Sequence, residues 1–282
     1  MQKNLGQHFL HNSDIARSIA LAVPTEKNET ILEIGPGEGI LTEALLATGC
    51  DVLAIEKDAA LIPVLEKRFA TALATGQLQL LHEDIRNMEA VLNALQNTNT
   101  PSQSSPIVEG EAPQPQQKYQ IVANIPYYIT GQIIRQFLTC ARQPTSMTLL
   151  LQKEVAERIC SRNGKESILS LSVAAYGEPQ YIRTVKAGSF SPPPKVDSAV
   201  LTIEHISRRN FIHARHEAQF FTILHTAFTG KRKMLRATLK DIATEAQLHS
   251  CDIAPTSRPE TVSLEQWLCL AECLAPHDTA KK

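Results

Sequence analysis

Short apolar runs alternate with longer amphipathic stretches over the first three quarters of the chain. Five of these runs have the length and continuity of buried strands: residues 30–34, 51–55, 77–82, 119–123 and 147–151. Helical spacing of apolar residues fills the stretches between them, at 40–47, 59–74 and 131–140, and a first helix runs from Ile15 to Val23. Strands that alternate with helices predict an α/β fold built on a mostly parallel sheet.

The pattern changes after residue 205. Two further strands are predicted at 180–186 and 198–205, and beyond them apolar residues recur only at helical spacing, as in 220–228 and 264–274. We therefore predict a large α/β domain at 1–206 and a small all-helical domain at 207–282. Residues 96–117 contain four prolines and five glutamines, which predicts a disordered, removable surface insertion within the first domain.

Three glycines at alternate positions follow the strand at 30–34. Gly35, Gly37 and Gly39 lead into a helix, and such a turn lets the backbone approach a nucleotide closely. The spacing is Gly-x-Gly-x-Gly, and we interpret this shorter turn as a site for S-adenosylmethionine rather than for a dinucleotide. Glu56 ends the next strand and is placed to accept the ribose hydroxyls. Asp84, after the third strand, is suited to the adenine amine.

The strand at 119–123 ends in Asn124-Ile125-Pro126-Tyr127. Pro126 fixes the backbone, so the Asn124 side-chain oxygen and a neighbouring carbonyl can accept two hydrogens of an exocyclic amine. Tyr127 offers a face for stacking on the base. The alternative is an ordinary strand end with a proline turn and a core tyrosine. The pattern thus predicts catalytic roles for Asn124, Pro126 and Tyr127.

Composition and charge add a division between the two parts of the chain. The 282 residues carry a net charge of −1, but residues 1–126 sum to −7 and residues 127–282 to +6. Lys231, Arg232, Lys233 and Arg236 form a basic group at a helix start, for which phosphate contact is the favoured interpretation and a solvated helix face the alternative.

The chain shows neither a membrane-spanning run nor a signal-peptide pattern, so we expect a soluble, cytoplasmic protein. Six cysteines occur without a Cys-x-x-Cys pair. We expect them to be reduced core residues, and we expect no metal site and no disulfide.

Seven segments together resemble the ribosomal RNA adenine dimethyltransferases, and in particular the bacterial type that modifies two adjacent adenosines near the 3′ end of 16S rRNA. They are residues 6–10 (GQHFL), 32–37 (LEIGPG), 124–127 (NIPY), 151–156 (LQKEVA), 190–200, Arg232-Lys233 with Arg236, and 258–260 (RPE). The resemblance implies a Rossmann-like class I methyltransferase sheet with a small helical carboxyl-terminal domain. It departs at Ile168-Leu169, where the family has Tyr-Gly, and in the length of the insertion at 96–117.

The resemblance also implies a set of functional residues and partners. His8, Leu10, Gly35, Gly37, Glu56, Asp84 and Asn124 would bind S-adenosylmethionine. Phe190, Lys195, Lys231, Arg232, Lys233 and Arg236 would contact the RNA. The enzyme would act on the small ribosomal subunit as a monomer. Two alternatives remain open: the related class that methylates adenine in 23S rRNA, and a non-catalytic ribosome assembly factor.

Overall fold

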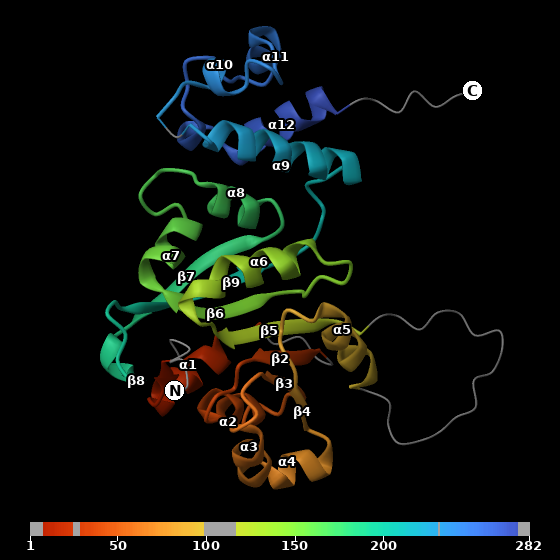
Figure 1. Cartoon of the computed structure of the whole chain (residues 1–282), viewed down its shortest axis with the longest axis vertical. Helices are drawn as coiled ribbons and strands as arrows, with labels where there is room; N and C mark the ends of the chain where they lie inside the picture. The colour runs from red at the N-terminus through yellow and green to blue at the C-terminus, as the bar shows by residue number, and fades with distance from the viewer. Residues whose placement is uncertain (1–7, 25–28, 99–116, 231, 276–282) are drawn as a thin grey trace, which may run out of the picture. The chain divides into compact units, whose positions relative to one another are not determined.

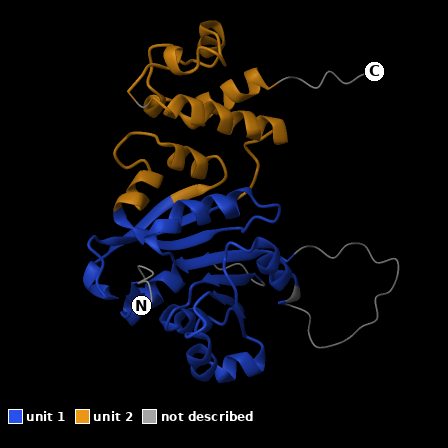
Figure 2. Cartoon of the chain, viewed as in Figure 1, with its two compact units in different colours: residues 1–153, 180–204 blue, residues 154–179, 205–282 orange. Residues whose placement is uncertain are grey.

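The computed structural model describes residues 8–24, 29–98, 117–230 and 232–275 (Figure 1). Contacts between residues divide the chain into two compact units (Figure 2). Unit 1 comprises Met1–Lys153 and Gln180–Glu204, and unit 2 comprises Glu154–Pro179 and His205–Lys282. The second unit therefore contains one segment from the middle of the sequence besides the carboxyl-terminal helices. The predicted domains at 1–206 and 207–282 stay a prediction.

Unit 1 is built on the predicted, mostly parallel sheet. The strands are β1 (Phe9–Leu10), β2 (Thr30–Ile34), β3 (Val52–Glu56), β4 (Leu78–His82), β5 (Tyr119–Asn124), β6 (Met147–Gln152), β7 (Glu178–Val185), β8 (Phe190–Ser191) and β9 (Ser198–Glu204). Seven of them form one sheet in the order β4-β3-β2-β5-β6-β9-β7. The pairs from β4 to β6 are parallel, and β9 runs antiparallel to β6. The predicted α/β fold class is confirmed.

The helices follow the predicted order with three differences. They are α1 (Ser13–Leu21), α2 (Ile40–Leu46), α3 (Ile62–Arg68), α4 (Ala70–Thr75), α5 (Met88–Asn97), α6 (Thr130–Thr139), α7 (Lys153–Ile159), α8 (Ile168–Ala174), α9 (Ala214–Phe228), α10 (Leu235–Thr238), α11 (Glu245–Ser250) and α12 (Leu264–Leu274), with 3-10 turns η1 (Tyr127–Ile129), η2 (Ala187–Ser189) and η3 (Pro259–Thr261). The predicted single helix at 59–74 is wrong. It breaks at Phe69, whose ring packs so close to Gly39 that a Cβ on that glycine would lie 2.5 Å from it.

The other two differences concern polar helices. Helix α5 was not predicted. It buries Val91 and Leu95 and continues through Gln96 and Asn97, so the predicted insertion begins too early. The rest of the insertion, apart from Thr98 and Gln117, lies outside the described residues. The short helix α11 was not predicted, because it buries only Leu248 and so lacks an apolar stripe.

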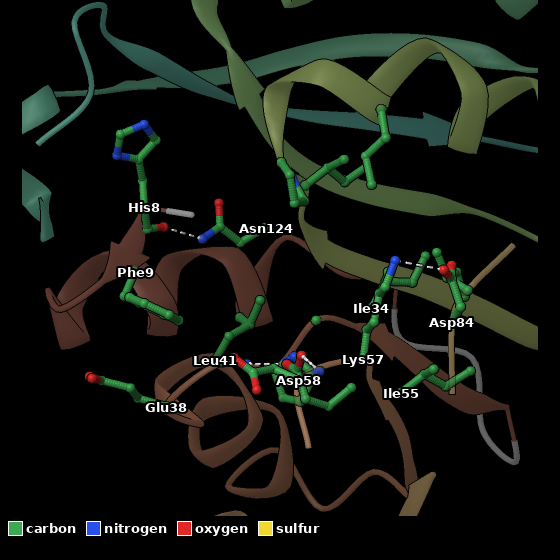
Figure 3. Close-up of a pocket in the computed structure, with 18 of the residues that line it drawn as sticks. His8, Phe9, Ile34, Glu38, Leu41, Ile55, Lys57, Asp58, Asp84 and Asn124 are labelled. Carbon is green, nitrogen blue, oxygen red and sulfur yellow. Dashed lines mark hydrogen bonds and ion pairs between the residues drawn. The ribbon is translucent and has the colours of Figure 1, made fainter. Parts of the chain in front are cut away.

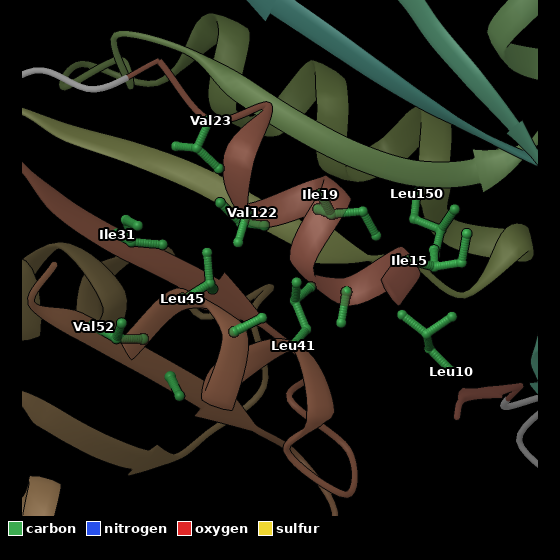
Figure 4. Packing of buried hydrophobic residues seen from close by; sticks show 14 of the residues in the cluster. Leu10, Ile15, Ile19, Val23, Ile31, Leu41, Leu45, Val52, Val122 and Leu150 are labelled. Carbon is green, nitrogen blue, oxygen red and sulfur yellow. The ribbon is translucent and has the colours of Figure 1, made fainter. Parts of the chain in front are cut away.

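One face of the sheet is covered by α1 and α2 (Figure 4). Asn12 caps α1 by accepting the backbone N–H groups of Asp14 and Ile15. Ile15 and Ile19 of α1 then pack into one buried cluster with residues of α2 and of strands β2, β3 and β5. Alternate strand residues such as Leu32 and Leu53 are also buried. A parallel sheet covered on both faces holds its strand ends rigidly, and this rigidity positions the site described below.

The chain changes direction in the sheet between β2 and β5. From β2 it proceeds to β3 and β4 on one side, and then returns to β5 and β6 on the other. At such a switch point the loops that follow the two neighbouring strands diverge and leave a crevice at their carboxyl ends. The turn that contains Gly35, Gly37 and Gly39, here called the glycine turn, follows β2. The turn formed by Asn124-Ile125-Pro126-Tyr127, here called the Asn124 turn, follows β5. The topology therefore places the two predicted motifs on either side of this crevice.

The expectation about the cysteines is wrong for one pair. Cys251 and Cys269 are joined in a disulfide, and Cys50, Cys140 and Cys160 are only half-buried, while Cys273 is exposed. The pairing depends on a turn after α11 that brings Cys251 to α12, a tertiary contact that spacing in the sequence does not reveal. None of the helices in the described part of the chain has the length and apolar character needed to cross a bilayer.

Candidate active site

A cavity of about 480 Å³ opens at the carboxyl edge of β2, β3 and β5 (Figure 3). Its walls come from five segments: β1, the glycine turn, the end of β3, the loop after β4 and the Asn124 turn. All the residues predicted to bind the cofactor or to act in catalysis line it, namely His8, Leu10, Gly35, Gly37, Glu56, Asp84, Asn124, Pro126 and Tyr127. Segments separated by more than a hundred residues in the sequence thus form one site.

The glycine turn is anchored by Glu56, whose side chain is buried. One Glu56 carboxylate oxygen accepts the backbone N–H of Gly37 at 3.1 Å, and the other accepts that of Asp58 at 2.8 Å. Gly37 has a φ of 59°, and a Cβ there would lie 3.0 Å from the Phe9 ring. A side chain at this position would be strained and would press on Phe9, so glycine keeps the turn close to the cavity. Each Glu56 oxygen retains a lone pair for a ligand.

A second acid lies behind the glycine turn without a partner. Glu33 of β2 is 1% exposed, and within the described residues neither of its carboxylate oxygens has a hydrogen-bond partner. Burial, opposed by the neighbouring Thr42 hydroxyl and assisted by the Glu56 carboxylate, raises the pKa of Glu33 to about 8. The folded protein therefore favours the protonated form of Glu33, which sequence reasoning missed because its run of apolar neighbours indicated only a strand.

Asp84 carries ion pairs that its position in the sequence did not indicate. Arg86 Nε donates to both Asp84 carboxylate oxygens at 3.0 and 3.1 Å, and Lys57 Nζ lies 2.8 Å from Asp84 Oδ2. The Arg86 guanidinium, with a smaller contribution from Lys57, holds the pKa of Asp84 well below its usual range. Asp84 is thus an ionised acceptor on the cavity wall, paired with these two cations.

Asn124 is oriented by the amino-terminal segment. Its side-chain Nδ2 donates to the His8 carbonyl at 3.1 Å, the contact drawn as a dashed line in Figure 3. Because the amide nitrogen is engaged, the amide oxygen is the group that Asn124 offers as an acceptor. His8 is fixed in turn, since its Nδ1 donates to the Pro192 carbonyl at 2.7 Å and the next residues pair with β8. Residues 8–10 thus line the cavity, and Leu10 also packs in the buried cluster with Ile15 and Ile19 of α1.

Two consecutive tyrosines follow Pro126 with different exposure. The Tyr127 hydroxyl lies 2.8 Å from Ser198 Oγ, its ring lies 5.7 Å from that of His8, and burial raises its pKa. Tyr128 is 69% exposed although it also lines the cavity, so its ring stands at the rim. Sequence reasoning did not single out Tyr128, and the doubled aromatic after the proline was the available signal.

None of the predicted RNA contacts that the structure describes is among the residues lining this cavity. Phe190 is buried, pairs with Leu10 through β8 and belongs to the core cluster, whereas Lys195 is exposed. In unit 2, three basic side chains are exposed, and none has an acidic partner at ion-pair distance within the described residues: Arg232, Lys233 and Arg236. Lys231 lies outside the described residues. RNA contact by all six residues stays a prediction.

Comparisons with known proteins identify the family of this chain. A family model described as ribosomal RNA adenine dimethylase matches residues 1–276. Ribosomal RNA small subunit methyltransferase A of Dehalococcoides mccartyi is 34% identical over 277 residues, covering 95% of this chain and 87% of that protein. Its namesake in Caulobacter vibrioides is 33% identical over 272 residues and covers 96% of both chains.

Two solved structures share the fold. The 23S rRNA methyltransferase ErmE superimposes with a TM-score of 0.70 at 23% identity, covering 94% of this chain and 99% of that one. A dimethyladenosine transferase from Plasmodium falciparum also gives 0.70, at 24% identity, covering 93% and 96%. These two likenesses confirm the class I methyltransferase fold and do not distinguish between the substrates of the two enzymes.

Proposed function

This chain belongs to the ribosomal RNA adenine dimethylase family, and we propose that it dimethylates N6 of two adjacent adenosines in the hairpin near the 3′ end of 16S rRNA, with S-adenosylmethionine as the methyl donor. The observation that carries the proposal is the Asn124 turn, which faces the glycine turn across one cavity at the switch point of the sheet. We further propose that the enzyme acts as a monomer in the cytoplasm, where small subunits are assembled.

The cavity suits S-adenosylmethionine. Glycine at position 37 lets the turn pack against the Phe9 ring without a clash, and the buried Glu56 carboxylate offers acceptors for ribose hydroxyls. We assign Asp84 to the adenine amine, and His8, Leu10, Gly35 and Asn124 to the remaining wall. When bound, the cofactor supplies an electrophilic methyl group on a positively charged sulfur.

The turn after β5 positions the target amine. The lone pair of adenine N6 is delocalised into the ring, so the amine attacks only when it becomes pyramidal. We assign its two hydrogens to Asn124 Oδ1 and to the Ile125 or Pro126 carbonyl. The Pro126 carbonyl already accepts the Ile129 N–H at 3.1 Å and has one lone pair left. No protein base is needed beforehand, because the amine is neutral. Positioning and hydrogen bonding carry the catalysis.

An aromatic ring stacks on the target adenine and holds it during methyl transfer. The target adenine leaves its stack to reach the cavity, and the Tyr127 ring, held through its hydroxyl by Ser198, replaces one neighbour for about 1–3 kcal/mol. A second transfer requires the singly methylated amine to rotate beside Asn124, for which the cavity has space.

The small-subunit substrate rests on the curated relatives, whose names specify that subunit at 33–34% identity over nearly the whole chain. The test is methyl incorporation from labelled S-adenosylmethionine into unmethylated small subunits and large-subunit RNA in parallel, with modified adenines mapped by primer-extension arrest. We expect dimethyladenosine only at the paired adenosines of 16S rRNA. Signal confined to large-subunit RNA would overturn the proposal in favour of the 23S class, and cofactor binding without any transfer would favour an assembly factor.

Charge reversal in unit 2 tests the predicted phosphate contacts. Because Arg232 and Lys233 are exposed and unpaired within the described residues, we expect Arg232→Glu with Lys233→Glu to weaken RNA binding and to reduce the slope of log affinity against log salt by about 1 for each lost contact. Lys67→Glu, on an exposed position of α3 in unit 1, is the matched control. Affinity and salt slope equal to those of the control would assign the two residues to a solvated surface.

The exposed ring of Tyr128 leads to a second prediction. The substrate presents two adjacent adenines, and a ring on the cavity rim can stack on the neighbour of the target base. We expect Tyr128→Ala to raise KM for the RNA about 5- to 100-fold, which corresponds to about 1–3 kcal/mol, with kcat changed less. Tyr128→Phe keeps the ring and should behave like the wild type. A loss of equal size in both variants would show that the hydroxyl matters and the stacking face does not.

A further inference from the structure

Three cysteine sulfurs lie close together in unit 2. Cys251 directly follows α11, and Cys269 and Cys273 lie one helical turn apart on α12. The three Sγ atoms lie within 4.8 Å of one another. Cys251 and Cys269 form the disulfide, while Cys273 Sγ is a free thiol 3.6 Å from Cys251 Sγ. The cluster therefore contains one more sulfur than the disulfide uses.

Contacts other than the disulfide hold these sulfurs together. Gln266 of α12 donates from its side chain to the Asp252 carbonyl at 2.6 Å, which ties the residue after Cys251 to the start of the helix. Leu248 and Ile253 on either side of Cys251 are buried, as are Trp267 and Leu270 of α12. The start of α12 is fixed by a capping box between Ser263 and Gln266. The fold thus preorganises the three positions in the reduced protein as well.

We propose that the reduced chain binds one thiophilic closed-shell cation, Zn²⁺ or Cu⁺, through Cys251, Cys269 and Cys273. Thiolates are the ligands that these ions prefer. Zn–S bonds of about 2.3 Å in a tetrahedral site place the sulfurs about 3.8 Å apart, close to the 3.6 Å between Cys251 and Cys273. Cys251 is buried, Cys269 is half-buried and Cys273 is exposed, so the ion enters from the side of Cys273.

The cation and the disulfide exclude each other. A dithiol reductant transfers two electrons and two protons to the Cys251–Cys269 bond and becomes a disulfide itself, which leaves three thiols. Binding then releases the thiol protons as the sulfurs become thiolate ligands. A Zn²⁺ ion completes its coordination with water, since three protein ligands leave one position open, whereas Cu⁺ needs only the three sulfurs. The cluster is therefore a metal site under reducing conditions and a cross-link under oxidising ones.

The segment after Cys251 connects this cluster to the basic residues of unit 2. The backbone N–H of Arg236 donates to the Pro255 carbonyl, and that of Leu235 donates to the Ser257 carbonyl, each at 2.9 Å. Segment 251–257 thus holds the first turn of α10 in place. A cation bound at Cys251 would stiffen the support of Arg236, although the metal site itself does not depend on the proposed function.

The experiment uses the full chain, reduced with a phosphine and freed of reductant without oxygen. Co²⁺ is added as a spectroscopic probe for Zn²⁺, and Zn²⁺ and Cu⁺ are each titrated alone against a chromophoric chelator. We expect one equivalent per chain, with sulfur-to-cobalt charge-transfer bands and the visible bands of a tetrahedral ion. Cys160 is a half-buried cysteine of the same unit, and Cys160→Ser should still bind one metal ion per chain. The titration in which the protein retains its ion in competition with the chelator identifies the metal.

Cys273→Ser is the decisive variant, because its side chain is exposed and the change should not disturb the fold. We expect it to lose the bound equivalent and the charge-transfer bands while its thermal unfolding in the reduced, metal-free state matches that of the wild type. Undiminished binding by this variant would overturn the proposal, as would a reduced wild-type chain that retains no ion. Equal binding by the oxidised chain, with the disulfide verified by intact mass, would also overturn it.

Discussion

Replacing Asn124 with alanine is expected to lower kcat for methyl transfer by about 10²- to 10³-fold while the affinity for RNA changes little. The variant removes the side-chain acceptor that holds the target amine, a contact that strengthens as N6 becomes pyramidal. It also removes the hydrogen bond to the His8 carbonyl, which fixes the amino-terminal segment. A group that acts mainly in the transition state lowers kcat more than it raises KM. Single-turnover transfer to the 16S hairpin, with binding measured separately, provides the measurement.

Two further variants separate the parts played by the Asn124 amide. Asn124→Asp keeps an acceptor oxygen but lacks the N–H donated to the His8 carbonyl, so its activity should lie between those of the wild type and Asn124→Ala. Asn163→Ala, in an exposed loop of unit 2, should be as active as the wild type. If Asn124→Ala instead weakened RNA binding as much as it lowered transfer, Asn124 would be a substrate-binding or structural residue and the assigned role would be wrong.

The parts of the fold that the sequence predicted well are those with local causes. Strand β2 and the turn at Gly35 are adjacent in the chain. The turn requires positive φ angles, and the glycines that occupy these positions adopt such angles without strain. The end of β5 at Asn124 is likewise marked by the stop of an apolar run. Once these strands are parallel, their ends meet at one edge whatever the loops do. This is why the predicted cofactor residues and the Asn124 turn line one cavity.

The features that the sequence did not predict depend on contacts between distant segments. Helix 59–74 breaks because Phe69 packs on Gly39, thirty residues earlier. The Asp84 carboxylate is shared with Lys57, which arrives from the end of a different strand. The disulfide between Cys251 and Cys269 likewise needs the turn after α11. Neither periodicity nor motif spacing encodes such pairings, because each depends on how two elements pack.

Glu33 provides the prediction with the largest effect on stability. Its pKa of about 8 in the folded protein lies above the ordinary value of 4.5, because burial disfavours the ionised form. Below pH 4.5 the carboxyl is protonated in both the folded and the unfolded chain. As pH rises from 4.5 to about 8, the unfolded chain loses the proton of this carboxyl and the folded chain keeps it. The free energy of unfolding therefore falls through this range and is constant above it. The difference between the two pKa values corresponds to a loss of about 5 kcal/mol at most in the free energy of unfolding.

Glu33→Gln removes this pH dependence, because glutamine resembles the protonated acid in shape and cannot ionise. Relative to the wild type, its free energy of unfolding in urea should therefore rise by several kcal/mol between pH 5 and pH 8, within the bound of about 5 kcal/mol. Glu38→Gln makes the same chemical change at an exposed position in the turn that follows β2, and it serves as the control. A Glu33→Gln difference that is constant with pH would mean that the folded protein holds Glu33 ionised. In that case a cation or a donor would have to reach the carboxylate behind the glycine turn, and the neutral acid inferred from its burial would be wrong.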